Sequence, residues 1–199
     1  MTDASASPNA DHAGFDPPLR IDWLGPEHLN DGLPGRLGLT ILPGKRGVSV
    51  RYPGRVYRRD LDEDFAALRI AGVGRLILLV EDAELRRWGD PEIVARGRAG
   101  GVEVLRFPTP DGRPPASVDE IRSILAAVHD GRRTGSVAVA CMGGVGRSGT
   151  VAACALVDAG MTAPDAIATV RSVRHPTAVE TAAQERFVRS YATEANGRR

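Results

Sequence analysis

The stretch VAVACMGGVGRSGT, residues 137–150, places a cysteine after an apolar run and follows it with five mostly small residues and an arginine. The apolar residues 136–140 predict a buried strand, and residues 148–160, which are apolar nearly all round, predict a central helix. Sites in open α/β sheets form at the carboxyl ends of strands. We therefore expect a site in the loop from 141 to 148, where a central strand ends and a buried helix begins.

The rest of the chain alternates between strand patterns and helix patterns. Strands or extended segments are expected at 19–24, 37–44, 75–80 and 102–108. Helices are expected at 61–72, 117–130, 163–174 and 179–193, and one or two short helices are expected within 82–99. Ser117 and Glu120 predict a capping box for the helix at 117–130. The alternation predicts an α/β fold with a central, mostly parallel sheet flanked by helices.

Length and composition favour a single domain. A chain of 199 residues, 42% of them hydrophobic, can bury one good core. Residues 1–18 are polar, small and proline-bearing, so we expect a disordered N-terminal tail there. With a frayed C-terminus expected at 195–199, the domain is expected to span residues 19–194.

Charge and cysteine content argue against several classes of protein. Lys and Arg number 26 against 25 Asp and Glu, so no global charge directs the chain to nucleic acid or to an anionic membrane. Cys141 and Cys154 are too few for a disulfide framework or a zinc site, which favours a reducing compartment. The chain has neither a signal-peptide pattern nor an apolar run of about 18 residues, so we expect a cytoplasmic protein, with a monomer favoured. Lys45, the only lysine, is attributed to codon bias and given no role.

The loop that follows Cys141 has the composition of an anion-binding nest. Its three glycines allow successive amides to converge on one point, the helix N-terminus adds a positive dipole end, and Arg147 can hold two phosphate oxygens at once. The same groups are expected to lower the pKa of the Cys141 thiol and to make it a nucleophile at neutral pH. The residues expected to bind phosphate are Met142, Gly143, Gly144, Val145, Gly146 and Arg147.

The spacing Cys-x5-Arg-Ser in this loop resembles the signature loop of the cysteine-dependent protein phosphatases. FPTPDGRPP at 107–115 resembles the aspartate-bearing loop of their dual-specificity branch, and ETAAQERFVRSY at 180–191 resembles their C-terminal glutamine-bearing segment. With LPGKRG at 42–47 added, the resemblance is greatest to the cyclin-dependent-kinase-associated phosphatases, and it covers residues 37–193.

The resemblance implies a dual-specificity phosphatase-like fold and a two-step mechanism without a metal or a cofactor. Cys141 would attack phosphorus and form a phosphocysteine, while Arg147 and the loop amides hold the remaining oxygens. Asp111 would protonate the leaving group and then act as a base toward water, and the Ser148 hydroxyl would help the thiolate leave. The implied substrate is a phosphotyrosine or phosphoserine/phosphothreonine protein, or a small phosphomonoester.

The sequence departs from the family pattern at two positions. Ala140 stands where the family usually has a histidine that orders the loop. Glu180 stands where tyrosine-specific members have a water-positioning glutamine, although Gln184 matches the second glutamine. We find no aromatic-bearing loop of the kind that deepens the pocket of tyrosine-specific members. Met142 and Val145 are neutral, whereas phosphoinositide-directed relatives have basic residues within Cys-x5-Arg. A shallow, non-lipid pocket is therefore expected.

Two other functions stay open. One is a pseudophosphatase, a phosphate-dependent binding module without turnover, which Ala140 and Glu180 favour and the intact nucleophile, arginine and aspartate oppose. The other is arsenate reduction or sulfur transfer through the same thiol. This function lacks a convincing resolving cysteine, because Cys154 lies on an apolar helix and has the pattern of a core residue.

Three arginines are expected to have little structural importance. Arg147 is treated as an exposed loop cation that contributes little to folding. Arg171 and Arg174 lie in one predicted helix and are expected to form its solvated face rather than a docking patch.

Overall fold

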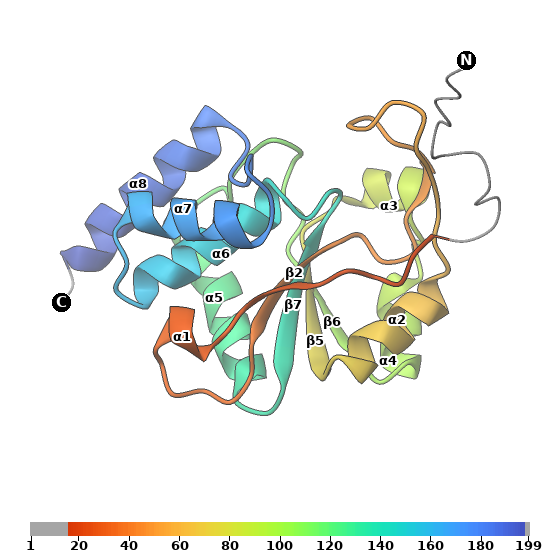
Figure 1. The fold of residues 1–199 in the computed structure, drawn as a ribbon, viewed down its shortest axis with the longest axis horizontal. Helices are drawn as coiled ribbons and strands as arrows, with labels where there is room; N and C mark the ends of the chain where they lie inside the picture. Colours follow the sequence, from red (N-terminus) through yellow and green to blue (C-terminus); the bar gives the residue numbers. More distant parts are fainter. Residues whose placement is uncertain (1–15, 198–199) are drawn as a thin grey trace, which may run out of the picture.

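The computed structural model describes residues 16–197, so most of the expected N-terminal tail and the last two residues lie outside the described range. A five-stranded sheet with the order β1-β2-β7-β5-β6 forms its centre (Figure 1). Its strands are β1 (Asp22–Leu24), β2 (Leu37–Ile41), β5 (Val73–Leu78), β6 (Glu103–Arg106) and β7 (Ser136–Cys141). β1 pairs antiparallel with β2 and the other neighbours are parallel, which confirms the predicted sheet.

Helices cover both faces of this sheet (Figure 1). On one side lie α1 (Pro26–Leu29), α5 (Val118–Arg132), α6 (Arg147–Asp158), α7 (Ala163–Val173) and α8 (Ala182–Asn196). On the other side lie α2 (Leu61–Ile70), α3 (Asp82–Trp88) and α4 (Ile93–Ala99). The sequence predicted all of these helices except α1, which is only one turn long. Within residues 16–197, no helix has the length and apolar character needed to cross a membrane.

The alternation of side chains along β7 separates two hydrophobic cores. Val137, Val139 and Cys141 belong to the core beneath α5 to α8. Ala138 and Ala140 point the other way, into the core beneath α2 to α4, because successive side chains of a strand lie on opposite faces. Ala140, at the position of the family's histidine, is fully buried there and faces away from the Cys141 side.

A two-stranded hairpin was not predicted. It consists of β3 (Arg46–Val48) and β4 (Val56–Arg58), which pair antiparallel outside the central sheet. Asp16, a residue of the expected tail, lies against it and accepts hydrogen bonds from the Arg58 amide (2.6 Å) and the Arg55 side chain (3.2 Å). Tertiary contacts thus hold a hairpin whose strands of three residues each are too short for a period-two pattern.

The predicted capping box of α5 is half present. Ser117 Oγ accepts a hydrogen bond from the Glu120 amide (3.1 Å), as expected for an N-cap. The Glu120 carboxylate instead accepts from the amide of Ala116 (2.5 Å), one residue before the cap. The helix start is therefore where the sequence placed it, with a different partner for the glutamate.

Candidate active site

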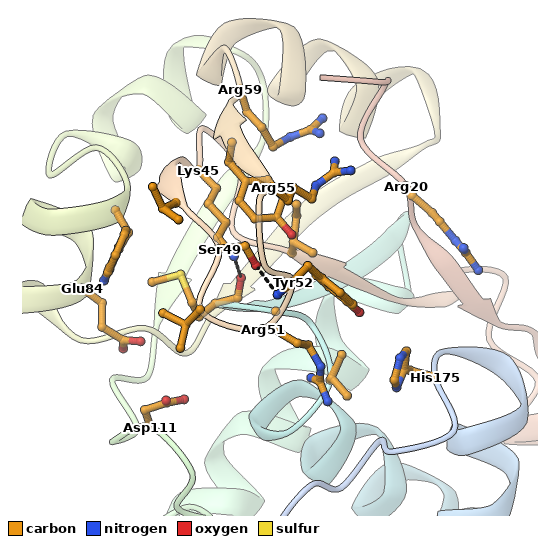
Figure 2. A pocket seen from close by; sticks show the side chains of 18 of the residues that line it. Arg20, Lys45, Ser49, Arg51, Tyr52, Arg55, Arg59, Glu84, Asp111 and His175 are labelled. Carbon is orange, nitrogen blue, oxygen red and sulfur yellow. Dashed lines mark hydrogen bonds between the residues drawn. The ribbon is translucent and has the colours of Figure 1, made fainter. Parts of the chain in front are cut away.

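The loop after Cys141 lies at the carboxyl end of β7, the central strand, as the sequence predicted. β7 ends at Cys141, and α6 begins at Arg147. Met142, Gly143 and Val145 of this loop line a pocket of about 960 Å³. Figure 2 shows residues of the β3–β4 hairpin, with Glu84 and Asp111, around the same pocket.

The carbonyl oxygens of the loop accept hydrogen bonds from donors outside it. Lys45 Nζ donates to Met142 (3.1 Å), Arg174 to Gly143 (3.0 Å) and Gly144 (2.8 Å), the Val179 amide to Val145 (3.2 Å), and the Thr150 amide to Gly146 (2.9 Å). In a planar trans peptide the C=O and the following N–H point in opposite directions, so the amides of residues 143–147 face away from these donors. This is the arrangement of an anion-binding nest.

Gly144 is the glycine that the loop requires for its backbone path. Its φ is +67°, in the left-handed region that residues with a side chain rarely adopt. A Cβ at this position would also collide with the Thr40 carbonyl oxygen of β2 and with the Arg174 side chain. The loop can therefore approach β2 this closely only with glycine at 144.

Cys141 is buried at the base of the nest, with its sulfur 3.3 Å from Ser148 Oγ. Burial raises the pKa of this thiol, but the Arg147 charge and hydrogen bonds from Ser148 and from the Val145 amide outweigh burial. The pKa of Cys141 consequently lies below its ordinary value, as the sequence predicted. In Cys154, by contrast, burial and the Asp158 charge raise the pKa well above that value, and its place in the core confirms the structural assignment.

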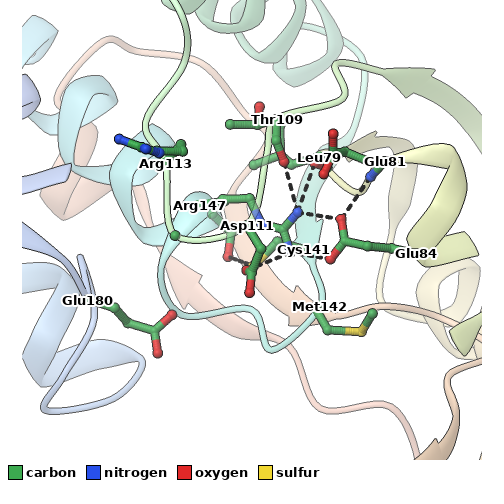
Figure 3. Close-up of polar contacts among 12 residues, drawn as sticks. Leu79, Glu81, Glu84, Thr109, Asp111, Arg113, Cys141, Met142, Arg147 and Glu180 are labelled. Atoms are coloured by element: carbon green, nitrogen blue, oxygen red, sulfur yellow. Dashed lines mark hydrogen bonds and ion pairs between the residues drawn. The ribbon is translucent and has the colours of Figure 1, made fainter. Parts of the chain in front are cut away.

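Arg147 is buried, with 2% of its surface exposed, so the expectation of an exposed loop cation was wrong. Its guanidinium forms a two-point ion pair with Glu84 of α3 (2.6 and 2.7 Å). It also donates to the carbonyls of Thr109 (2.9 Å) and Leu79 (3.4 Å) (Figure 3). Burial lowers the pKa of Arg147, but the hydrogen bond and charge of Glu84 raise it above its usual value, so the side chain stays charged.

Glu84 is a site residue that the sequence analysis missed. Its carboxylate accepts from the Glu81 amide (2.9 Å) as well as from Arg147, so the first turn of α3 fixes its direction. The pattern Glu81-x-x-Glu84 directly after a buried strand is the local signal that marks this helix start. That pattern does not indicate that Glu84 pairs with Arg147, which lies 63 residues away in sequence.

Asp111 lies beside Arg147, although the two are far apart in sequence. A hydrogen bond of 3.0 Å closes the turn at residues 110–113, and a φ of +69° at Gly112 makes it a type II turn. The Asp111 side chain is 83% exposed, and its Oδ1 lies 3.1 Å from Arg147 Nη2 (Figure 3). The fold thus brings the predicted acid to the predicted phosphate-binding loop.

The start of α8 holds the Asp111 turn in place. Thr181 Oγ1 donates to the Gly112 carbonyl (2.9 Å), and Gln184 Nε2 donates to the Arg113 carbonyl (3.3 Å). Gln184 is buried, and its Oε1 accepts from the Thr181 amide (3.3 Å) in the capping box of α8. Both ends of the Gln184 amide therefore form hydrogen bonds with backbone groups of the chain.

Glu180 lines the pocket and pairs with a residue of the hairpin. The Arg51 guanidinium contacts its carboxylate and also donates to Thr177 Oγ1 (2.7 Å). This pair places the positive charge of Arg51 next to Glu180, the residue that stands where tyrosine-specific family members have a glutamine. It also ties the connection between β3 and β4 to the segment that precedes α8.

Two basic residues that were given no role in the site hold the loop. The Arg174 side chain is 9% exposed, pairs with Asp22 of β1 and binds two loop carbonyls, so the expectation of a solvated face at this residue was wrong. The Lys45 ammonium lies over the Tyr57 ring, 4.1 Å from its centroid, and donates to Met142 next to the nucleophile. Among residues 16–197, Lys45 has no carboxylate within ion-pair distance, unlike the arginines around it.

Aromatic side chains line part of the pocket. Tyr52 lies on the connection between β3 and β4, Tyr57 on β4 and Trp88 at the end of α3. Two of these three aromatic residues belong to the hairpin, which was not predicted from the sequence.

Comparison with known proteins places these features in a family. Residues 56–197 match the family described as "Swiss Army Knife protein, DSP-PTPase phosphatase domain". The chain is 29% identical over 179 residues to "Cyclin-dependent kinase inhibitor 3" from Rattus norvegicus, an alignment that covers 87% of this chain and 79% of that protein. It is 37% identical over 76 residues to "Protein tyrosine phosphatase type IVA 3" from Mus musculus, covering 37% of this chain and 44% of that protein.

Solved structures agree with this assignment. A kinase-associated phosphatase whose catalytic cysteine is replaced by serine matches with a TM-score of 0.78 at 22% identity, covering 90% of this chain and 97% of the other, and shows the same fold. Tk-PTP in its active form matches with a TM-score of 0.64 at 29% identity, covering 80% and 92%. The chain therefore belongs to the Swiss Army Knife family of DSP-PTPase phosphatase domains and is a cysteine-dependent protein phosphatase.

Proposed function

We propose that this phosphatase hydrolyses phosphomonoesters in two steps, through a phosphocysteine at Cys141. The observation that carries the proposal is the loop whose carbonyls are bonded from outside, which leaves its amides free to face an anion. The equatorial oxygens of the phosphoryl group carry the charge of the transition state. The amides of residues 142–147 and the Arg147 guanidinium stabilise that charge without having to reorganise.

Asp111 and Ser148 carry out the proton transfer and assist the leaving groups. Asp111 gives its proton to the departing alcohol or phenol oxygen, and then accepts one from the water that attacks the phosphocysteine. Its carboxyl, 3.1 Å from Arg147, lies next to the group that holds the phosphoryl oxygens. Ser148 Oγ, 3.3 Å from the sulfur, stabilises the thiolate that departs when phosphate is released.

A binding module without turnover is less well supported than an enzyme. The nucleophile, the arginine and the acid lie in one constellation, and the pKa of Cys141 is lowered. Neighbouring residues also compensate for Ala140 and Glu180, the two departures from the family pattern. Arg51 pairs with Glu180, and Lys45 supplies a cation and a loop contact that Ala140 does not.

Trapping the covalent intermediate tests the proposed mechanism. We expect that a phosphotyrosine peptide carrying ³²P, mixed with the enzyme and quenched in acid within milliseconds, labels the peptide that contains Cys141. Cys141→Ser should give no label, and Cys154→Ala, which removes the other thiol, should still be labelled. Turnover by the wild type with no labelled cysteine, or with label on another residue, would contradict the mechanism.

The chemistry of Lys45 supports a second, smaller prediction. Its ammonium lies in a buried position against the residue that follows the nucleophile, and an opposite charge near a thiolate lowers the pKa of the thiol. Lys45→Met should therefore raise the Cys141 pKa, which leaves a smaller fraction of thiolate at any pH below that pKa. Iodoacetamide inactivation followed against pH measures the shift, since only the thiolate reacts.

Two controls separate the charge of Lys45 from a general loss of structure. Lys45→Arg keeps a cation at this position and should restore most of the inactivation profile. Arg20→Met removes another pocket cation, which is exposed and already paired with Asp22, and should leave the inflection where it is. An unchanged inflection in Lys45→Met would show that this ammonium does not act on the thiolate.

We further propose that the substrate is a phosphoprotein carrying phosphotyrosine or phosphoserine/phosphothreonine. The volume of the pocket supports this, as do the kinase-related names of the relatives. A cytoplasmic location and a single domain over residues 19–194 are part of the same proposal, and the two free cysteines, Cys141 and Cys154, support a reducing compartment.

A further inference from the structure

The hairpin gathers exposed apolar side chains at the mouth of the pocket. Six large hydrophobic side chains are exposed within residues 16–197, and four of them lie on this hairpin. They are Val48 (59% exposed), Val50 (92%), Tyr52 (45%) and Val56 (45%). Apolar surface of this kind gains nothing from folding while it stays in water, and its concentration in one place is typical of an interaction site.

Three of these four side chains belong to the pocket wall itself. Val48, Val50 and Tyr52 line the same pocket as Met142 and Gly143 of the phosphate-binding loop. Figure 2 shows Tyr52 at this pocket. A phosphoryl group held by that loop would place the residues next to it in the substrate chain against the hairpin. The apolar surface is thus continuous with the site in which the substrate reacts.

The connection between β3 and β4 is a built structure rather than a frayed end. The Ser49 amide donates to the Arg55 carbonyl (2.8 Å), the Tyr52 amide to Ser49 Oγ (2.9 Å), and the Arg55 amide to the Tyr52 carbonyl (3.1 Å). Arg51 then joins it to Glu180 on another wall of the pocket. Val50, between these bonded residues, is therefore held in water by the fold.

The charges around the pocket indicate which substrate chain the hairpin accepts. Each of the pocket arginines lies within ion-pair distance of a carboxylate: Arg20 and Arg174 share Asp22, while Arg51 pairs with Glu180, Arg55 with Asp16 and Arg59 with Asp64. Lys45 has no carboxylate partner, but it is buried and bonded to the Met142 carbonyl, so few exposed cations without a partner remain for acidic residues beside the phosphorylated one. Apolar neighbours, in contrast, meet an exposed surface of valine and tyrosine.

We propose that the β3–β4 hairpin docks the substrate chain and selects phosphoproteins with apolar residues directly next to the phosphorylated residue. This inference rests on the proposed function, because it assigns a substrate class to the same site. Val48 and Val50 contact the flanking side chains, and burial of both surfaces on binding favours the apolar substrate. The hairpin thus acts on substrate choice, whereas the Cys141 loop acts on the reaction.

Three substrates and two variants test the inference. The substrates are a phosphotyrosine peptide with leucine on both sides of the phosphotyrosine, the same peptide with serine at both positions, and an aryl phosphate without a peptide. We expect the wild type to prefer the leucine peptide by about tenfold in kcat/KM. Val48→Ser combined with Val50→Ser should reduce that ratio to about one, while Ile70→Ser, which changes an equally exposed residue on α2, should keep it.

The outcomes separate this inference from the proposed function. Equal kcat/KM on the two peptides in the wild type, or an undiminished preference in the double variant, overturns docking by the hairpin. Turnover of the aryl phosphate with neither peptide hydrolysed also overturns docking, but leaves the phosphocysteine chemistry standing. Absence of turnover on all three substrates defeats the proposed function itself, and the inference with it.

Discussion

Replacing Arg147 by lysine is expected to lower kcat/KM by about 10³-fold or more, since an arginine that stabilises transition-state charge in phosphoryl transfer is typically worth about 10³–10⁵-fold. Lysine keeps the charge but not the planar fork that holds two oxygens of a phosphoryl group while pairing with Glu84. Steady-state kinetics on an aryl phosphate measure the loss. A variant with near wild-type kcat/KM would show that the guanidinium does not hold the phosphoryl group.

The same substitution is expected to lower the free energy of unfolding, contrary to what the sequence implied. Lysine cannot satisfy all the acceptors that Arg147 meets in the core, among them Glu84 and the carbonyls of Thr109 and Leu79. Buried acceptors left unpaired cost about 1–3 kcal/mol, and urea unfolding measures this. Arg186→Lys, the same change on an exposed face of α8, should alter neither stability nor rate.

Removing the carboxyl of Asp111 is expected to have an effect that depends on the leaving group. A leaving oxygen that is strongly basic needs a proton in the transition state, whereas an activated fluorinated aryl oxide hardly does. Asp111→Ala should therefore lose about 10²–10⁴-fold in kcat/KM on a phosphotyrosine peptide and much less on the activated ester. The ratio of the two losses is the measurement.

Asp119→Ala is the matched control for the acid. Asp119 is 93% exposed on the first turn of α5 and pairs only weakly with Arg122 (3.2 Å), so its removal should leave both substrates unaffected. If Asp111→Ala loses the same factor on both substrates, Asp111 shapes its turn, and the general acid is another residue. The result does not depend on the stability of either variant, because the two substrates are compared within the same variant.

The central sheet and most helices could be predicted because their patterns are local. The six residues of β7 and the nine buried residues of α6 that follow Arg147 are apolar or small, so the sequence alone marks both elements. The position of Cys141 followed from the same local pattern, since a loop between such elements lies at a strand end. The candidate nucleophile and arginine were identified from this pattern, whereas the candidate acid, Asp111, was identified from the resemblance of residues 107–115 to a known family.

The supporting contacts could not be predicted because they join distant segments. Lys45 and Met142 are 97 residues apart, and Arg174 and Gly143 are 31 apart. Arg147 was expected to be exposed because charged side chains are rarely buried without a partner, and its partner comes from a different helix. The hairpin escaped prediction for the same reason, since contacts to Asp16 and Glu180 hold it rather than its own short strands.

The outward bonding of the loop carbonyls has a consequence for the order of events during synthesis of the chain. Apart from the Thr150 amide of α6 itself, the donors come from the segment before α2, from the end of α7 and from the segment leading into α8, so they reach the loop only when these parts have docked. A nascent chain that has formed only β7 and α6 carries the whole Cys-x5-Arg motif but has not yet oriented its dipoles. We therefore expect catalytic competence to be acquired with the last tertiary contacts, so that a partly folded chain does not expose an active thiolate.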